Sequence, residues 1–126
     1  MLLKDIWQQQ ALTPILSTVD RIDYSNDTVA ALPNGPLSVA RYELAATGNQ
    51  SFGYFAGGAY PDPGPRSNVD RIDYSNDHLT AAPKGNLSAA RLVVSASGNA
   101  DFGYFGGGAQ PAASSKVDRI DYANDT

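Results

Sequence analysis

The chain has no cysteine, and its 126 residues include one histidine, one tryptophan and one methionine. Without cysteine there is neither a disulfide framework nor a thiolate metal site, so cysteine usage leaves the cellular compartment open. A Ser-His-Asp triad would have to converge on the lone His78, and no serine lies in a nucleophile-elbow sequence. The sequence therefore favours a protein that is not an enzyme and that needs no cofactor.

Charge is also scarce: charged residues make up 17% of the chain, and the formal net charge is −4. A phosphate-backbone binder needs clustered lysine and arginine, which this sequence lacks, so a nucleic-acid partner is disfavoured. No segment approaches 18 apolar residues, and Lys4, Asp5 and three glutamines stand where a signal peptide would need an apolar core. We expect no membrane span and no signal peptide.

Small and turn-forming residues are abundant instead, with 12 glycines and 8 prolines. This excess over leucine, glutamate and lysine argues against a helical protein. A hydrophobic content of 42% still provides enough apolar surface to offset the entropy lost on folding. The composition predicts an ordered chain with frequent turns.

The chain is a repeat array. A nonapeptide, Val-Asp-Arg-Ile-Asp-Tyr-Ser-Asn-Asp, occupies 19–27, recurs unchanged at 69–77 and returns at 117–125 with Ala123 in place of serine. A second motif, Phe-Gly-Tyr-Phe followed by glycines, starts at Phe52 and again 50 residues later at Phe102. Repeats of this period cannot bury their apolar faces alone and must stack on their neighbours.

The repeats divide the chain into four parts: an N-terminal arm or cap (1–18), repeat 1 (19–68), repeat 2 (69–116) and a partial repeat 3 (117–126). In the arm, Leu2, Leu3, Ile6 and Trp7 fall on one face at helical spacing. One interpretation is a cap over the exposed face of the first repeat. The other is an anchor into a neighbouring subunit or a larger particle, since tryptophan is favoured at contact hot spots.

The sequence of each repeat predicts four short strands. Residues 19–24 and 52–55 are rich in β-formers, whereas prolines that cannot donate to a ladder end the runs 28–32 and 78–82 and mark them as outer strands. Glycine pairs after the aromatic strand allow close approach of the backbone. The remaining expected strands, rich in small apolar residues, are 39–47 and 89–97.

Four strands in about 50 residues, with a glycine pair closing an aromatic strand, resemble the kelch repeat. The resemblance covers residues 19–126 and implies blades of a β-propeller. It departs from the family in lacking a tryptophan on the fourth strand, where Ala31 and Ala81 stand. The residues that carry the resemblance and would define the blades are Tyr54, Gly57, Gly58, Tyr104, Gly107, Gly108, Arg41 and Arg91.

Counted as blades, the strands give one complete blade between two partial ones, whereas a propeller ring needs roughly 4 to 8. The strand beginning at Val117 would then expose unpaired backbone groups that recruit another chain. We therefore expect a homo-oligomer, with cyclic symmetry, in which chains complete each other's blades. The residues expected at the contacts are Val117, Ile120 and Tyr122, together with the four apolar residues of the arm.

The amino-acid sequence of the repeats is also similar to that of repeats in virion proteins of marine bacteriophages, especially tail or fibre components. This resemblance implies a structural or host-contact role within a virion, beside other virion proteins. The alternative is a recognition module for a surface glycan or receptor, whose best site is the loop 59–66. There, Tyr60 could stack on a sugar and Arg66 could pair with its acidic groups, unless the prolines of the loop make it a stiff connector.

The three aspartates of each nonapeptide, Asp20, Asp23 and Asp27 in the first, suggest calcium, but their spacing fits no known loop. Strand alternation also places Asp20 and Asp23 on opposite faces. We expect structural ion pairs instead, with Arg21 or Asp23 pairing with Asp27 or Arg41 of the same or the next repeat, and a turn of the Asx type. His78, which replaces a threonine of the first repeat, is expected to be an exposed substitution.

Overall fold

The computed structural model describes residues 14–26, 28–60 and 64–126. Within them the chain forms strands β1 to β13 and a single short 3-10 helix, η1 (Tyr74–Asn76). Every strand pair is antiparallel. The predicted all-β class is confirmed. No helix in this part of the chain is long and apolar enough to cross a membrane.

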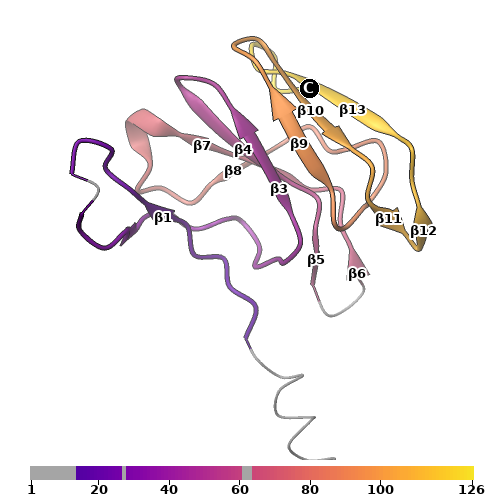
Figure 1. Ribbon diagram of the computed structural model, residues 1–126, viewed down its shortest axis with the longest axis horizontal. Helices are drawn as coiled ribbons and strands as arrows, with labels where there is room; N and C mark the ends of the chain where they lie inside the picture. Colours follow the sequence, from indigo (N-terminus) through magenta and orange to yellow (C-terminus); the bar gives the residue numbers. More distant parts are fainter. Residues whose placement is uncertain (1–13, 27, 61–63) are drawn as a thin grey trace, which may run out of the picture.

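Three sheets follow one another along the chain and fan out side by side (Figure 1). The N-terminal sheet pairs β1 (Asp20–Arg21) with β2 (Leu32–Pro33). The central sheet is a meander in the order β3-β4-β7-β8, and the C-terminal sheet has the order β9-β10-β13. The bounds are β3 (Ala45–Gly48), β4 (Phe52–Ala56), β7 (Val69–Asp73), β8 (Ala82–Lys84), β9 (Ser95–Gly98), β10 (Phe102–Gly106) and β13 (Val117–Asp121).

Two short hairpins follow the aromatic strands. In the first, β5 (Ala59–Tyr60) pairs with β6 (Gly64–Pro65). In the second, β11 (Ala109–Gln110) pairs with β12 (Ala112–Ala113). The length difference between the two repeats falls in these hairpins.

The predicted order of strands along the chain is found, but several predicted bounds are wrong. The expected strands 39–47 and 89–97 shrink to β3 and β9, because Glu43 (φ 57°) and Val93 (φ 56°) turn the backbone out of the extended region. The expected strands 28–32 and 78–82 are mostly turn, and pairing starts only at β2 and β8. Both of these strands contain proline and lie at a sheet edge. This position suits proline, because it has no backbone N–H to donate to a neighbouring strand.

The core lies between the central and C-terminal sheets. Its buried members are Tyr54, Ala56, Val69, Leu87, Val94, Phe105, Ile120 and Tyr122. Glycines make room for the tyrosine rings: a Cβ on Gly103 would lie 2.6 Å from both the Tyr122 hydroxyl and Thr47 Cγ2. Glycine within these strands therefore serves packing between sheets.

The glycine pair after each aromatic strand has positive φ in both repeats, with Gly57 at 70° and Gly58 at 87°. A Cβ on Gly58 would lie 2.5 Å from the Tyr42 carbonyl oxygen. Close backbone approach at this pair is thus confirmed, and no other residue type fits without displacing the neighbouring loop.

Gly103 and Gly106 of β10 test whether stability depends on the space that a glycine leaves for the tyrosine rings, because only Gly103 lies against such a ring. Gly103→Ala is expected to lower the free energy of unfolding by about 1–3 kcal/mol, because its new methyl group meets Tyr122 and Thr47. Gly106→Ala, whose Cβ meets nothing closer than 3.5 Å and whose equivalent in β4 is Ala56, is the matched control and should be neutral or stabilising by about 0.5 kcal/mol. Urea unfolding followed by circular dichroism measures both; equal losses would contradict the packing argument.

Candidate functional site

A buried arginine ties the central sheet together. Arg41 comes from the loop before β3, and its Nη1 donates to the carbonyl oxygens of Gly57 (3.2 Å) and Asn68 (3.0 Å). Its Nη2 lies 3.0 Å from Asp70 Oδ2, and both side chains are fully buried. The backbone nitrogen and hydroxyl of Ser38 donate to the same carboxylate at 3.1 and 2.7 Å. One ion pair thus links the loop, the glycine pair and β7.

The C-terminal sheet repeats this arrangement. Arg91 donates to the carbonyl oxygens of Gly107 and Lys116, each at 2.9 Å, and pairs with Asp118 at 2.6 Å. Ser88 donates to Asp118 through its backbone nitrogen (3.0 Å) and its hydroxyl (2.7 Å). Because the arginine Nη atoms and the carboxylate oxygens are engaged within the chain, this cluster organises the fold and offers no reactive group.

Sequence reasoning singled out both arginines but missed their partners. The expected pairing of Asp23 with Arg41 is wrong, since it is the second residue of the nonapeptide, here Asp70, that meets Arg41. Asp23 instead accepts a hydrogen bond from the Ser25 backbone nitrogen at 2.9 Å, which closes an Asx turn. Both members of the ion pair recur in each repeat, and that recurrence was the signal that could have paired them.

A second recurring contact joins neighbouring sheets. The Tyr54 ring stacks on Tyr122, with centroids 4.9 Å apart and planes inclined by 14°. The Tyr54 hydroxyl donates to Asp125 Oδ1 (2.6 Å), while Arg71 Nη1 lies 2.8 Å from Asp125 Oδ2. Thr47 shares a hydrogen bond of 3.0 Å with the Tyr122 hydroxyl. Burial, and then the hydrogen bond to Asp125, raise the pKa of Tyr54, so its hydroxyl stays a donor.

Half of this contact recurs between the N-terminal and central sheets. Arg21 pairs with Asp77 at 3.0 Å, as Arg71 does with Asp125, which confirms the expected pairing of Arg21 with the last aspartate of the next nonapeptide. The tyrosine half is missing. Tyr74 holds the position of Tyr122 but is 49% exposed, whereas Tyr122 is 4% exposed.

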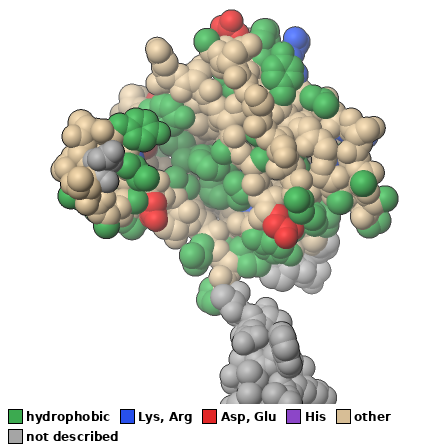
Figure 2. Space-filling view, in the orientation of Figure 1, with side chains coloured by type: hydrophobic (Ala, Val, Ile, Leu, Met, Phe, Trp, Pro, Cys, Tyr) green, Lys and Arg blue, Asp and Glu red, His purple; other side chains and the backbone are tan. Residues whose placement is uncertain are grey.

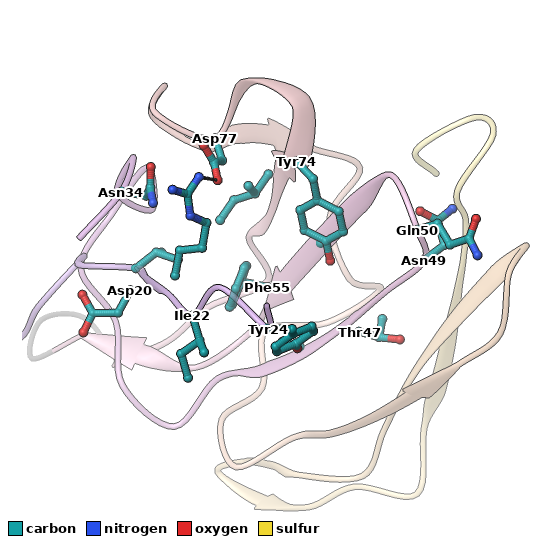
Figure 3. A pocket seen from close by; sticks show the side chains of 15 residues that line it. Asp20, Ile22, Tyr24, Asn34, Thr47, Asn49, Gln50, Phe55, Tyr74 and Asp77 are labelled. Atoms are coloured by element: carbon teal, nitrogen blue, oxygen red, sulfur yellow. Dashed lines mark hydrogen bonds and ion pairs between the residues drawn. The ribbon is translucent and has the colours of Figure 1, made fainter. Parts of the chain in front are cut away.

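The missing half leaves a groove of about 830 Å³ between the two sheets. Figure 2 shows the hollow, with hydrophobic side chains in its depth. In Figure 3, Tyr24 and Tyr74 line it together, and Thr47, Asn49 and Gln50 lie at its far end. The remaining lining residues are Val19, Asp20, Arg21, Ile22, Asn34, Ala46, Gly53, Phe55, Ile72 and Asp77.

The groove also holds an acidic group without its counterpart. Asp20 is the equivalent of Asp70 and Asp118, which both pair with an arginine. Asp20 is exposed, and no ion pair or side-chain hydrogen bond joins it to another residue of the described segments. Tyr24 in the same nonapeptide is 92% exposed. The groove therefore lacks the partners that the other nonapeptides have.

The other predicted contact residues are scattered. In β13, Val117 is 65% exposed, but Ile120 and Tyr122 belong to the core. The Arg66 guanidinium lies 3.4 Å from the centre of the Tyr60 ring, so that face of Tyr60 is covered within the chain. The apolar residues predicted for the arm, Leu2 to Trp7, lie outside the described residues.

The described residues contain no group of three or more metal-ligating side chains, and His78 is exposed. Comparison with protein-family models finds no match, and comparison with curated proteins finds no significant sequence similarity. The groove and the contact between sheets are therefore the features from which a function can be inferred.

The arginine cluster predicts a pH-dependent stability. Burial acts to raise the pKa of Asp118, but hydrogen bonds from Ser88 and the charge of Arg91 outweigh it, so the pKa lies below its ordinary value of 3.8. The stabilisation is therefore complete above that pH and is lost as the pH falls through the folded pKa.

Asp118→Asn is expected to lower the free energy of unfolding by about 2–3 kcal/mol at pH 7, because it leaves the Arg91 charge buried without a counter-charge. The difference from the unsubstituted chain should shrink as the pH falls below 3.8. Asp101→Asn, at an exposed aspartate, is the control and should change little. Urea titrations at several pH values measure this; an Asp118→Asn deficit independent of pH would contradict the assignment.

Proposed function

We propose that this chain is a non-enzymatic structural protein whose kelch-like repeats form propeller blades and whose function is self-association through the faces that its neighbouring sheets use among themselves. The central sheet serves as a complete blade, and the outer sheets serve as parts of blades that further copies of the chain complete. The assembly is cyclic, because propeller blades are related by a rotation about one axis, and a head-to-tail contact closes into a ring when that rotation is a whole fraction of a turn.

One observation carries the proposal: the contact between sheets is complete once, and its tyrosines are exposed in both outer positions of the described array. Tyr54 and Tyr122 bury each other, whereas Tyr104, the equivalent of Tyr54, is 37% exposed and Tyr74, the equivalent of Tyr122, is 49% exposed. Two faces that fit each other thus lie unmatched on one chain, which is the condition for head-to-tail association.

The free sheet edges support the same proposal. In the described residues β13 pairs only with β10, and β1 pairs only with β2. Each therefore presents an edge that another strand can extend. The similarity of the repeats to virion proteins of marine bacteriophages supports a virus particle as the setting, where such an assembly would be a tail or fibre component.

Self-association is tested by the mass of the chain in solution. At micromolar concentration, sedimentation is expected to give a mass of two or more times the 13.3 kDa of one chain. Tyr104→Ala should weaken the association about tenfold or more, because it removes an aromatic anchor from the contact.

Tyr42→Ala is the matched control, since Tyr42 is 43% exposed and takes no part in the stack of Tyr54 on Tyr122. It should leave the mass unchanged, and circular dichroism should show that both variants fold. A folded unsubstituted chain that stays at 13.3 kDa throughout the micromolar range would refute the proposed function.

A further inference from the structure

The groove between the N-terminal and central sheets lies where each of the other two sheets has a two-stranded hairpin. In the other two sheets a hairpin, β3-β4 or β9-β10, precedes the nonapeptide strand and pairs with it. Beside β1 no such hairpin exists in the described residues. We propose that the β9-β10 hairpin of a second copy of the chain occupies this groove and pairs with the free edge of β1; this rests on the self-association proposed above.

The central sheet already presents the receiving surface for this hairpin. Within one chain, Thr47 of β3 and Tyr54 of β4 contact Tyr122 of the following sheet. Their equivalents on the incoming hairpin are Ser97 and Tyr104, and the equivalent of Tyr122 in the groove is Tyr74. Tyr104 of the second copy would stack on Tyr74, and its hydroxyl would reach Asp77 as that of Tyr54 reaches Asp125.

The N-terminal sheet supplies the other complement. Arg91 stands at the base of the hairpin and pairs with Asp118 within its own chain. In the groove of the second chain, Asp20 is the equivalent of Asp118 and has no partner in the described segments. Tyr24 likewise holds the position of Tyr122 and is 92% exposed. The hairpin of the second copy would thus supply the partner of Asp20, and the central sheet of that same copy would supply the partner of Tyr24.

Entry of the hairpin requires an exchange of strands, since β10 already has β9 on one edge and β13 on the other. The nonapeptides at 19–27 and 117–125 differ only in Ser25 and Ala123. When β1 of one chain replaces β13 of another, the ion pair with Arg91 and the stack on Tyr54 are remade with the same side chains. Exchange of identical elements is a low-cost route to assembly.

This arrangement sets the size of the assembly. Each chain contributes its central sheet and shares one more four-stranded sheet with the next chain, which makes two sheets per chain. A ring of about 4 to 8 blades then holds about two to four chains. The expected masses are two, three or four times 13.3 kDa.

Crosslinking between two different variants tests the position of the hairpin. Within one chain Asn49 Nδ2 donates to the Ala100 carbonyl oxygen at 3.2 Å, so the loops that carry them touch. The equivalent contact between chains joins Asn99 of the hairpin to Gln50 of the groove. Asn99→Cys and Gln50→Cys chains, equilibrated together and treated with a short bismaleimide, are expected to give a crosslinked dimer, while each alone should not.

A double variant, Asn49→Cys with Ala100→Cys, is the matched control. It should crosslink within one chain, and it loses the same loop cap as Asn99→Cys, because Asn49 and Asn99 both accept from the residues that follow them. The chain has no cysteine of its own to interfere. Association without a crosslink between the two chains, when the control crosslinks, would refute the position of the hairpin and leave self-association standing. Absence of association would refute both.

Two aspartate variants test the exchange of strands. Asp20→Asn should reduce the yield of the crosslink about tenfold, because it removes the partner of Arg91 in the other chain. Asp118→Asn should maintain or increase it, because it weakens the strand that must leave. The opposite pattern would overturn the exchange. Filling of the groove by another segment of the same chain, or by a small molecule, would leave the two chains uncrosslinked and would likewise overturn the inference.

Discussion

The buried pairs of arginine and aspartate are the constraint on which the sheets depend. The strands are short and rich in glycine, alanine and serine, so they bury little apolar area, and burial alone holds such sheets weakly. Arg41 adds bonds to two further segments, the glycine pair and the start of β7, and its carboxylate partner Asp70 is itself held by Ser38. A buried charge pair tolerates few alternative geometries, which suits an element that must set register rather than add stability.

Contacts between sheets have a different character, and this difference separates folding from assembly. In the central and C-terminal sheets the ion pair of the arginine cluster is formed within the sheet itself. Between sheets, the pair Arg71 and Asp125 and the stack of Tyr54 on Tyr122 form a face that requires a complement. The same side chains, left unmatched at Tyr74 and Tyr104, connect the internal repeat to the proposed association of chains.

Much of the fold could be predicted from the sequence, because the repeat imposes the order of strands and the glycine pairs mark where the backbone passes closely. The bounds of β3 and β9 could not, since Glu43 and Val93 have positive φ, which residues of these types rarely adopt. The groove was also out of reach: it depends on which members of a repeated contact remain unmatched, and only the packing of the sheets reveals that Asp20 lacks the partner that Asp70 has.

The small hairpins after the aromatic strands show where this architecture can vary. The segment from β5 to β6 and its counterpart from β11 to β12 differ in length and amino-acid sequence. In both, a residue after the hairpin, Arg66 or Ser114, donates its backbone N–H to the carbonyl oxygen of the second glycine of the pair. Variation there reaches neither the ion pair nor the tyrosine stack. The protein thus carries a site at which new surface could evolve on each repeat while the architecture beneath it stays the same.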